Sequence, residues 1–172
     1  MPASLFTDEI LRALWTYWSA KRGEAEIPSR SDIDPVEIPR LLPHIQLVET
    51  IEPDGRFRYR LCGTAIVEAY GRDLTGRFVE EAIPQHRHAV ALRHYRLVRD
   101  TAQPIFARTQ YESERGAQII ANRLLLPLRN CGPRVGMLLI GQVCEFQSKV
   151  EIELGSAKAV DDYVEKIEIL GA

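Results

Sequence analysis

The segment PDGRFRYRLCGTAIVEAYGRDLTG, residues 53–76, constrains the fold more than any other part of the sequence. It begins with a Pro-Asp-Gly turn and continues with arginines that alternate with aromatic and aliphatic residues. At the two-residue period of a β-strand, this alternation gives one apolar face and one charged face. Gly63 ends the strand, and Gly71 ends a short helix over residues 64–70. The segment therefore predicts a strand followed at once by a short helix.

Periodicity and turn residues predict the other elements. Strands are expected over residues 44–51, 105–112, 118–128 and 134–146, with the first forming a hairpin with the strand at 56–62. Amphipathic helices are expected over residues 7–22, 85–100 and 156–170. The order of these elements predicts an α+β fold with an antiparallel sheet.

The strands at 118–128 and 134–146 are apolar at both phases of the two-residue alternation. Both faces of the sheet must therefore be covered near its middle. The helices between residues 64 and 100 cover only one face. The N-terminal helix or a second subunit is expected to cover the other, and this expectation motivates a homodimer through the N-terminal helix. Core packing and a dimer contact both remain open for this helix.

A proline-rich and acidic connection, residues 23–43, precedes the first strand. Asp34 has the features of a helix N-cap, with proline next and Glu37 three residues later to return a capping hydrogen bond. Capping and local ion pairs account for Arg30, Asp32 and Asp34 better than a catalytic or metal site. We expect three parts: residues 1–43 pack on a core at 44–146, and residues 147–172 form a strand or helix extension.

Composition excludes several classes of function. The net charge of −2 comes from interspersed charges, without the basic stripe of a nucleic-acid-binding protein. The three cysteines lack metal-binding spacing and are expected to be reduced core residues. No signal peptide or membrane-spanning run is apparent, so a cytoplasmic protein is expected, with neither nucleic acid nor membrane as a partner.

Catalytic signatures are absent from the sequence, and the spacing of the histidines does not indicate a catalytic or metal site. His86 and His88 diverge by about 200° on a helix and do not chelate one ion side by side. His94 alone lies on the apolar stripe of the helix at 85–100. A functional role for His94 would be to ligate a haem iron, to hydrogen-bond a small ligand or to form a pH-sensitive contact. A buried histidine with a structural role explains its position more simply.

Three motifs occur together: WSAKRG at the end of the first helix, PSRSDIDP in the connection, and YRLCGT followed by GRDLTG. With the order of elements, they resemble a PAS domain, and specifically the single-domain PAS-like family of alphaproteobacteria. The resemblance covers about residues 10–145. It implies a five-stranded antiparallel sheet flanked by helices that enclose a small cavity, in addition to the N-terminal and C-terminal helices. The family uses this fold for sensing or protein interaction.

Position by position, the resemblance makes five residues candidates for the cavity wall: Tyr59, Leu61, Tyr70, His94 and Val98. Each of them is also compatible with ordinary packing. No cysteine stands in the NCR-type motif of light-sensing relatives, so a covalent flavin photocycle is not supported. The cofactor, if there is one, stays unknown.

We therefore expect a non-enzymatic bacterial sensor that binds a small molecule or protein and acts in trans on a regulatory partner. The alternative is a small enzyme that uses His94 as a general base. A buried carboxylate would favour the enzyme, but the inward strand positions are expected to be apolar or aromatic. A third reading, a purely structural dimer, predicts no ligand-induced stabilisation.

Overall fold

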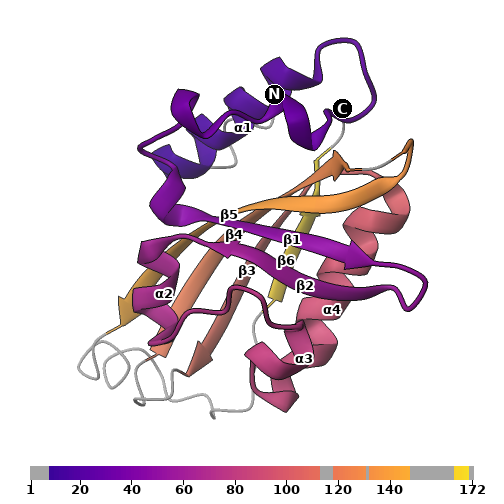
Figure 1. Ribbon diagram of the computed structural model, residues 1–172. Helices are drawn as coiled ribbons and strands as arrows, with labels where there is room; N and C mark the ends of the chain where they lie inside the picture. Colours follow the sequence, from indigo (N-terminus) through magenta and orange to yellow (C-terminus); the bar gives the residue numbers. More distant parts are fainter. Residues whose placement is uncertain (1–7, 113–117, 131, 148–164, 171–172) are drawn as a thin grey trace.

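A single antiparallel sheet organises the protein (Figure 1). The computed structural model describes residues 8–112, 118–130, 132–147 and 165–170. Six strands lie in the order β2-β1-β5-β4-β3-β6. Their bounds are β1 Ile45–Ile51, β2 Arg56–Cys62, β3 Ile105–Glu112, β4 Gln118–Arg129, β5 Val135–Gln147 and β6 Glu165–Ile169. The five strands predicted from the sequence are all present, and the α+β class is confirmed.

The sixth strand corrects the expected C-terminal helix. Residues 165–169 pair antiparallel with β3, with Thr109 opposite Glu165 and Ile105 opposite Ile169. Ile167 and Ile169 flank Glu168 in the sequence, and alternation of this kind favours a strand. An open edge at β3 provides the backbone groups that such a strand needs. The helix was therefore wrong over residues 165–169, and its earlier part lies outside the described residues.

The helices cover both faces of the sheet (Figure 1). The helix α1, Glu9–Arg22, lies against β4 and β5 on one face. The helices α2, Thr64–Tyr70, α3, Val79–Ala82, and α4, Gln85–Thr101, lie on the other. Asp8 caps α1 by accepting hydrogen bonds from the first turn. The N-terminal helix therefore provides the second cover that the doubly apolar strands require.

Close packing fixes α1 on the sheet. Leu11, Leu14 and Trp18 are fully buried, and the Trp18 indole donates a hydrogen bond to the carbonyl oxygen of Pro127 over 3.0 Å. Strand β5 has a glycine, Gly141, at the point where the helix crosses it. A Cβ atom at Gly141 would lie 2.6 Å from Leu14 Cδ2 and 3.1 Å from Leu11 Cδ2. A side chain at this position would hold the helix away from the sheet.

The proline-rich connection is ordered by short 3-10 helices, η2 Arg30–Asp32, η3 Pro35–Glu37 and η4 Leu42–His44. Asp34 caps η3 as predicted, by accepting from Val36. Glu37 binds α1: it accepts from Tyr17 over 2.8 Å and pairs with Lys21 at 2.6 Å. Asp34 therefore has the capping role that the sequence predicts, whereas Glu37 bonds to α1 in place of the predicted return hydrogen bond to the cap.

Candidate functional site

The strand register separates the two faces of the sheet. Gly141 meets α1, so its neighbours Ile140 and Gln142 face the layer occupied by α2 and α4. Gln46 lies opposite Ile140, and Arg123 lies opposite Gln142, which places both on the same inward face. All three polar residues are buried. The expectation that the inward strand positions are only apolar or aromatic was therefore wrong.

Arg123 is the most unusual of these residues, because it is a charged residue that is only 7% exposed. Its Nη2 donates a hydrogen bond to Tyr95 Oη over 2.8 Å, and its Cζ lies 5.3 Å from the centre of the Tyr95 ring. Its Nε has no hydrogen-bond partner. Within the described part of the chain, Arg123 forms no salt bridge with a carboxylate. A buried charge with this environment is costly unless something else offsets it.

Two tyrosines from opposite walls meet next to this arginine. Tyr59 on β2 and Tyr95 on α4 are both buried, and their hydroxyl oxygens are 3.2 Å apart. The Tyr95 ring also packs edge-on against Phe57, with 5.4 Å between the centres. Burial, and the proximity of the other phenols, raise the pKa of Tyr59 well above its ordinary value. Tyr59 is therefore a neutral hydrogen-bonding group at physiological pH.

Tyr70, at the end of α2, interacts electrostatically with two arginines, Arg87 and Arg123. Arg87 Nη2 donates to Tyr70 Oη over 3.3 Å, and the Arg87 guanidinium lies over the Tyr70 ring. Burial opposes ionisation of Tyr70, but the charges of Arg87 and Arg123 outweigh it and lower the pKa of this phenol. The inner face of the layer therefore has a positive electrostatic potential.

His94 and Val98 project from α4 into the same layer, and both are completely buried. Burial lowers the pKa of His94 to about 3, and the charges of Arg123 and Arg93 contribute in the same direction. The imidazole is therefore neutral near pH 7, and its basicity is too weak for a general base that operates there. The geometry gives no support to the enzyme alternative.

Leu61 does not join the other predicted wall residues. The β1–β2 register shifts between Leu47 and Val48, so that Tyr59 pairs with Val48 but Leu61 pairs with Leu47. Leu47 pairs with Leu139, which faces α1, and Leu61 is 39% exposed. Simple alternation places Tyr59 and Leu61 on one face, and the β-bulge separates them.

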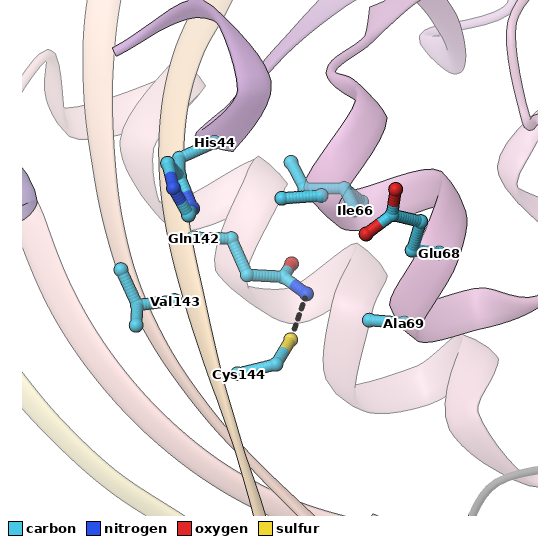
Figure 2. A pocket seen from close by; sticks show the side chains of 8 residues that line it. His44, Ile66, Glu68, Ala69, Gln142, Val143 and Cys144 are labelled. Atoms are coloured by element: carbon cyan, nitrogen blue, oxygen red, sulfur yellow. Dashed lines mark hydrogen bonds between the residues drawn. The ribbon is translucent and has the colours of Figure 1, made fainter. Parts of the chain in front are cut away.

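A hollow of about 270 Å³ opens between α2 and β5 (Figure 2). Its wall contains Gln142, which is 1% exposed and lies opposite Arg123 in the β4–β5 register. Gln142 Nε2 donates to Cys144 Sγ over 3.1 Å, and Oε1 has no hydrogen-bond partner. Figure 2 shows this amide facing Ile66 and Ala69 across the hollow. The wall residues are His44, Ala65, Ile66, Glu68, Ala69, Gln142, Val143 and Cys144.

We call five residues the inward polar cluster: Gln46, Tyr59, Tyr95, Arg123 and Gln142. Sequence reasoning identified only Tyr59 among them as a site residue. A signal for the others was present, because Arg123 lies in phase with the apolar inward residues Ile119 and Ala121 of its strand. Glutamines at the inward phase of β1 and β5 give the same signal. Tyr95 was visible only as part of an apolar helix stripe.

Metal binding has no basis in the described residues, where no group of three histidine, cysteine or acidic side chains is placed to hold an ion. Burial raises the pKa of Cys62 to about 12. Cys131 lies outside the described residues. Across those same ranges, none of the helices combines the length and apolar character needed to cross a bilayer.

Solved structures with a similar arrangement are light-oxygen-voltage domains. The light-state structure of the blue-light photoreceptor Aureochrome1 LOV is 11% identical, with coverage of 69% of this chain and 91% of that one and a TM-score of 0.47. The Rhodobacter sphaeroides LOV protein is 12% identical, with coverage of 71% and 74% and a TM-score of 0.48.

Sequence comparison is more decisive than these distant structures. No curated protein matches the chain. A family described as "PAS domain" matches residues 7–140, which include α1, the connection, the strands β1 to β4 and the first part of β5. This match extends over most of the sequence and agrees with the sheet order and the flanking helices. The chain therefore belongs to the PAS domain family.

Proposed function

We propose that this protein is a sensory module that binds a small molecule between the sheet and the helix α2. The observation that carries this proposal is the hollow whose wall continues, through Gln142, into the inward polar cluster. A layer that only had to be stable would contain apolar side chains, because unpaired buried polar groups lower stability. Pockets for small ligands combine an apolar wall with a few polar groups in this way.

A route for the signal runs through β5 to α1. Gln142 faces the hollow, and the adjacent Gly141 contacts Leu14 of α1 on the opposite face. A displacement of β5 on ligand binding would therefore change the surface on which this helix packs. We propose that the helix then changes its contacts with a regulatory protein in trans, by a shift between two arrangements.

Homodimerisation through α1 is the second part of the proposal. The fully buried residues of α1 already pack on its own sheet, so only its outer surface is free for a partner subunit. Sedimentation equilibrium with wild-type protein and an Arg12→Glu variant tests this contact, because Arg12 is exposed on α1. A monomer at every concentration would contradict the dimer and leave ligand sensing intact.

Thermal unfolding in the presence of metabolites, haem and flavins tests the sensor itself. A ligand that binds only the folded state raises the unfolding temperature with concentration. Binding without turnover is the expected result, and turnover that depends on His94 would instead establish an enzyme. A collection in which no compound stabilises the protein would count against small-molecule sensing and favour a structural or protein-binding module.

A further inference from the structure

Gln142 is the buried polar residue in the wall of the hollow between α2 and β5. Its Nε2 donates to Cys144 Sγ over 3.1 Å, whereas Oε1 has no hydrogen-bond partner among the described residues. A buried carbonyl oxygen without a donor lowers the stability of the protein. The terminal torsion of a glutamine is soft, so a small rotation turns Oε1 toward a donor in the hollow. The hollow therefore offers an unused hydrogen-bond acceptor.

Cys144 sets which end of this amide is available to a ligand. Residues 142 and 144 share the inward face of β5, because they are two positions apart on one strand. The sulfur accepts the hydrogen of Nε2, so the amino end of the amide is directed along the strand. A flipped amide would lose this N–H···S hydrogen bond. The carbonyl end therefore remains for the ligand, and the site selects a hydrogen-bond donor.

The charges near the hollow disfavour ligands of either sign. Arg123 is buried and lies opposite Gln142 in the β4–β5 register, so a cation placed beside Gln142 would be repelled across a layer of low dielectric. The lowered pKa of Tyr70 reports the same positive potential. On the α2 side, the wall contains the carboxylate of Glu68. An anion in the hollow would face this carboxylate and the acceptor atom of Gln142, and both groups repel it.

The rest of the wall suits a compact apolar body. Figure 2 shows the amide of Gln142 facing Ile66 and Ala69 across the hollow. Ala65 and Val143 add further apolar surface to the wall. The hollow has a volume of about 270 Å³, below the roughly 300 to 1,000 Å³ of drug-sized ligand pockets. A small molecule with a hydrocarbon body and few polar atoms matches this space.

We infer that the ligand is a small uncharged molecule with an apolar body and an O–H or N–H group, which donates a hydrogen bond to Oε1 of Gln142. This inference rests on the proposed sensory function and specifies the class of ligand. Cys144 is a positioning residue, because it acts through the orientation of the Gln142 amide. Alcohols with a short aliphatic or alicyclic body are the simplest members of this class.

Two matched series of probes test the inference near pH 7. The first is cyclohexanol, cyclohexanone, cyclohexylamine and cyclohexanecarboxylate, and the second is butan-2-ol, butan-2-one, butan-2-amine and 2-methylbutyrate. NMR titration gives each dissociation constant, and shifts of the backbone amides of Ile66 and Cys144 locate the binding in the hollow. At least one alcohol should bind about three- to tenfold tighter than its ketone, because only the alcohol donates a hydrogen bond. The ammonium and carboxylate members should bind more weakly than the alcohol.

Variants identify the acceptor through the ratio of ketone to alcohol dissociation constants, which a purely structural role would not change. Gln142→Met removes Oε1 and should bring this ratio to about 1. Gln46→Met is the matched control and should keep the wild-type ratio, since Gln46 is an equally buried inward glutamine on the neighbouring strand β1 but is not in the wall.

Cys144 and Glu68 provide two further comparisons. Cys144→Ser retains an acceptor for Nε2 and should keep the ratio, whereas Cys144→Ala releases the amide and should lower it. Glu68→Gln should leave the ratio unchanged, because the inference assigns the ligand's donor to Gln142. If Gln142→Met does not fold, the wild-type ratio and the two Cys144 variants still test the inference.

The outcomes distinguish the class of ligand from the sensory function itself. The inference is overturned if neither alcohol binds, if a ketone or a charged member binds tightest, if Gln142→Met keeps the wild-type ratio, or if Glu68→Gln abolishes it. Each of these results leaves the sensor proposal standing as long as some metabolite stabilises the protein. If neither these probes nor any other small molecule bind, both proposals fail.

Discussion

The two faces of the sheet are packed on different principles. Toward α1, Leu11, Leu14 and Trp18 fill the space completely, and the glycine at 141 lets the helix approach the strand. Toward α2 and α4, the same strands carry Arg123, Gln46 and Gln142 into a layer that also holds a hollow. The first face is built for stability, whereas the second includes buried polar groups that reduce it. The comparison places the buried polar groups and the hollow together on the second face.

Loss of Trp18 gives the largest expected effect on this comparison. Trp18→Ala removes a buried indole and its hydrogen bond to Pro127, and should lower the free energy of unfolding by about 3 to 5 kcal/mol. Urea denaturation measures this loss. Trp15→Ala, on the same helix but only partly buried, is the control and should cost much less. Equal costs would show that the α1 face is not tightly packed at Trp18.

A fall in pH should lower the stability of the folded protein, because His94 is buried on the α4 side of the sheet. Because the pKa is about 3 in the folded protein and 6.5 is the ordinary value, the unfolded state binds the proton first as the pH falls. Stability should therefore be complete above the ordinary pKa and should decline below it, by roughly 2 kcal/mol between pH 7 and pH 5. Denaturation at a series of pH values measures this decline.

Two variants identify the source of this pH dependence. His94→Asn should remove most of the decline, while His86→Asn, at an exposed position on the same helix, should leave it unchanged. A decline of the same size in His94→Asn would mean that the imidazole is already protonated in the folded state or that other groups dominate.

A single added methyl group tests the contact of α1 with β5. Gly141→Ala should cost about 1 to 3 kcal/mol, because its Cβ would overlap Leu14. The double variant with Leu14→Ala should cost less than the sum of the two single changes, since the truncated side chain makes room for the methyl group. Strictly additive costs would show that the two residues do not press on each other.

The smallest effect is expected from the tyrosine pair. Tyr59→Phe removes one hydrogen bond between neutral groups and should cost about 0.5 to 1.5 kcal/mol. Tyr95→Phe should cost more, because the guanidinium of Arg123 then loses its acceptor as well. The order of the two costs, measured by urea denaturation, is the test, and a larger cost for Tyr59→Phe would contradict the network.

Sequence patterns predict most of the fold because their local signals agree. The Asp34 cap, the 64–70 helix ended by Gly71, and the alternating strands all appear where the residues indicate. Strand β6 was missed because the residues up to 167 also fit a helical stripe, and only the open edge of β3 decides between the two. Long-range pairing of this kind is not encoded in a local period.

The site was less predictable than the fold. Tyr59, Tyr70, His94 and Val98 follow from their positions on the strand and helices, but the bulge that turns Leu61 away depends on the pairing of β1 with β2. The role of Arg123 also depends on which side chains surround it in the folded protein. A sequence shows that an arginine interrupts an apolar strand, but only the packed structure shows that no described carboxylate accompanies it.

Strand β6 has a further consequence for how the protein avoids self-association. It occupies the outer side of β3 from Ile105 to Thr109, where backbone amides and carbonyls would otherwise be open to a strand from another molecule. Removal of residues 165–169 would expose that row of groups beside an apolar layer. A shortened protein should then assemble by strand addition, so this small element acts as a guard against aggregation as well as a part of the sheet.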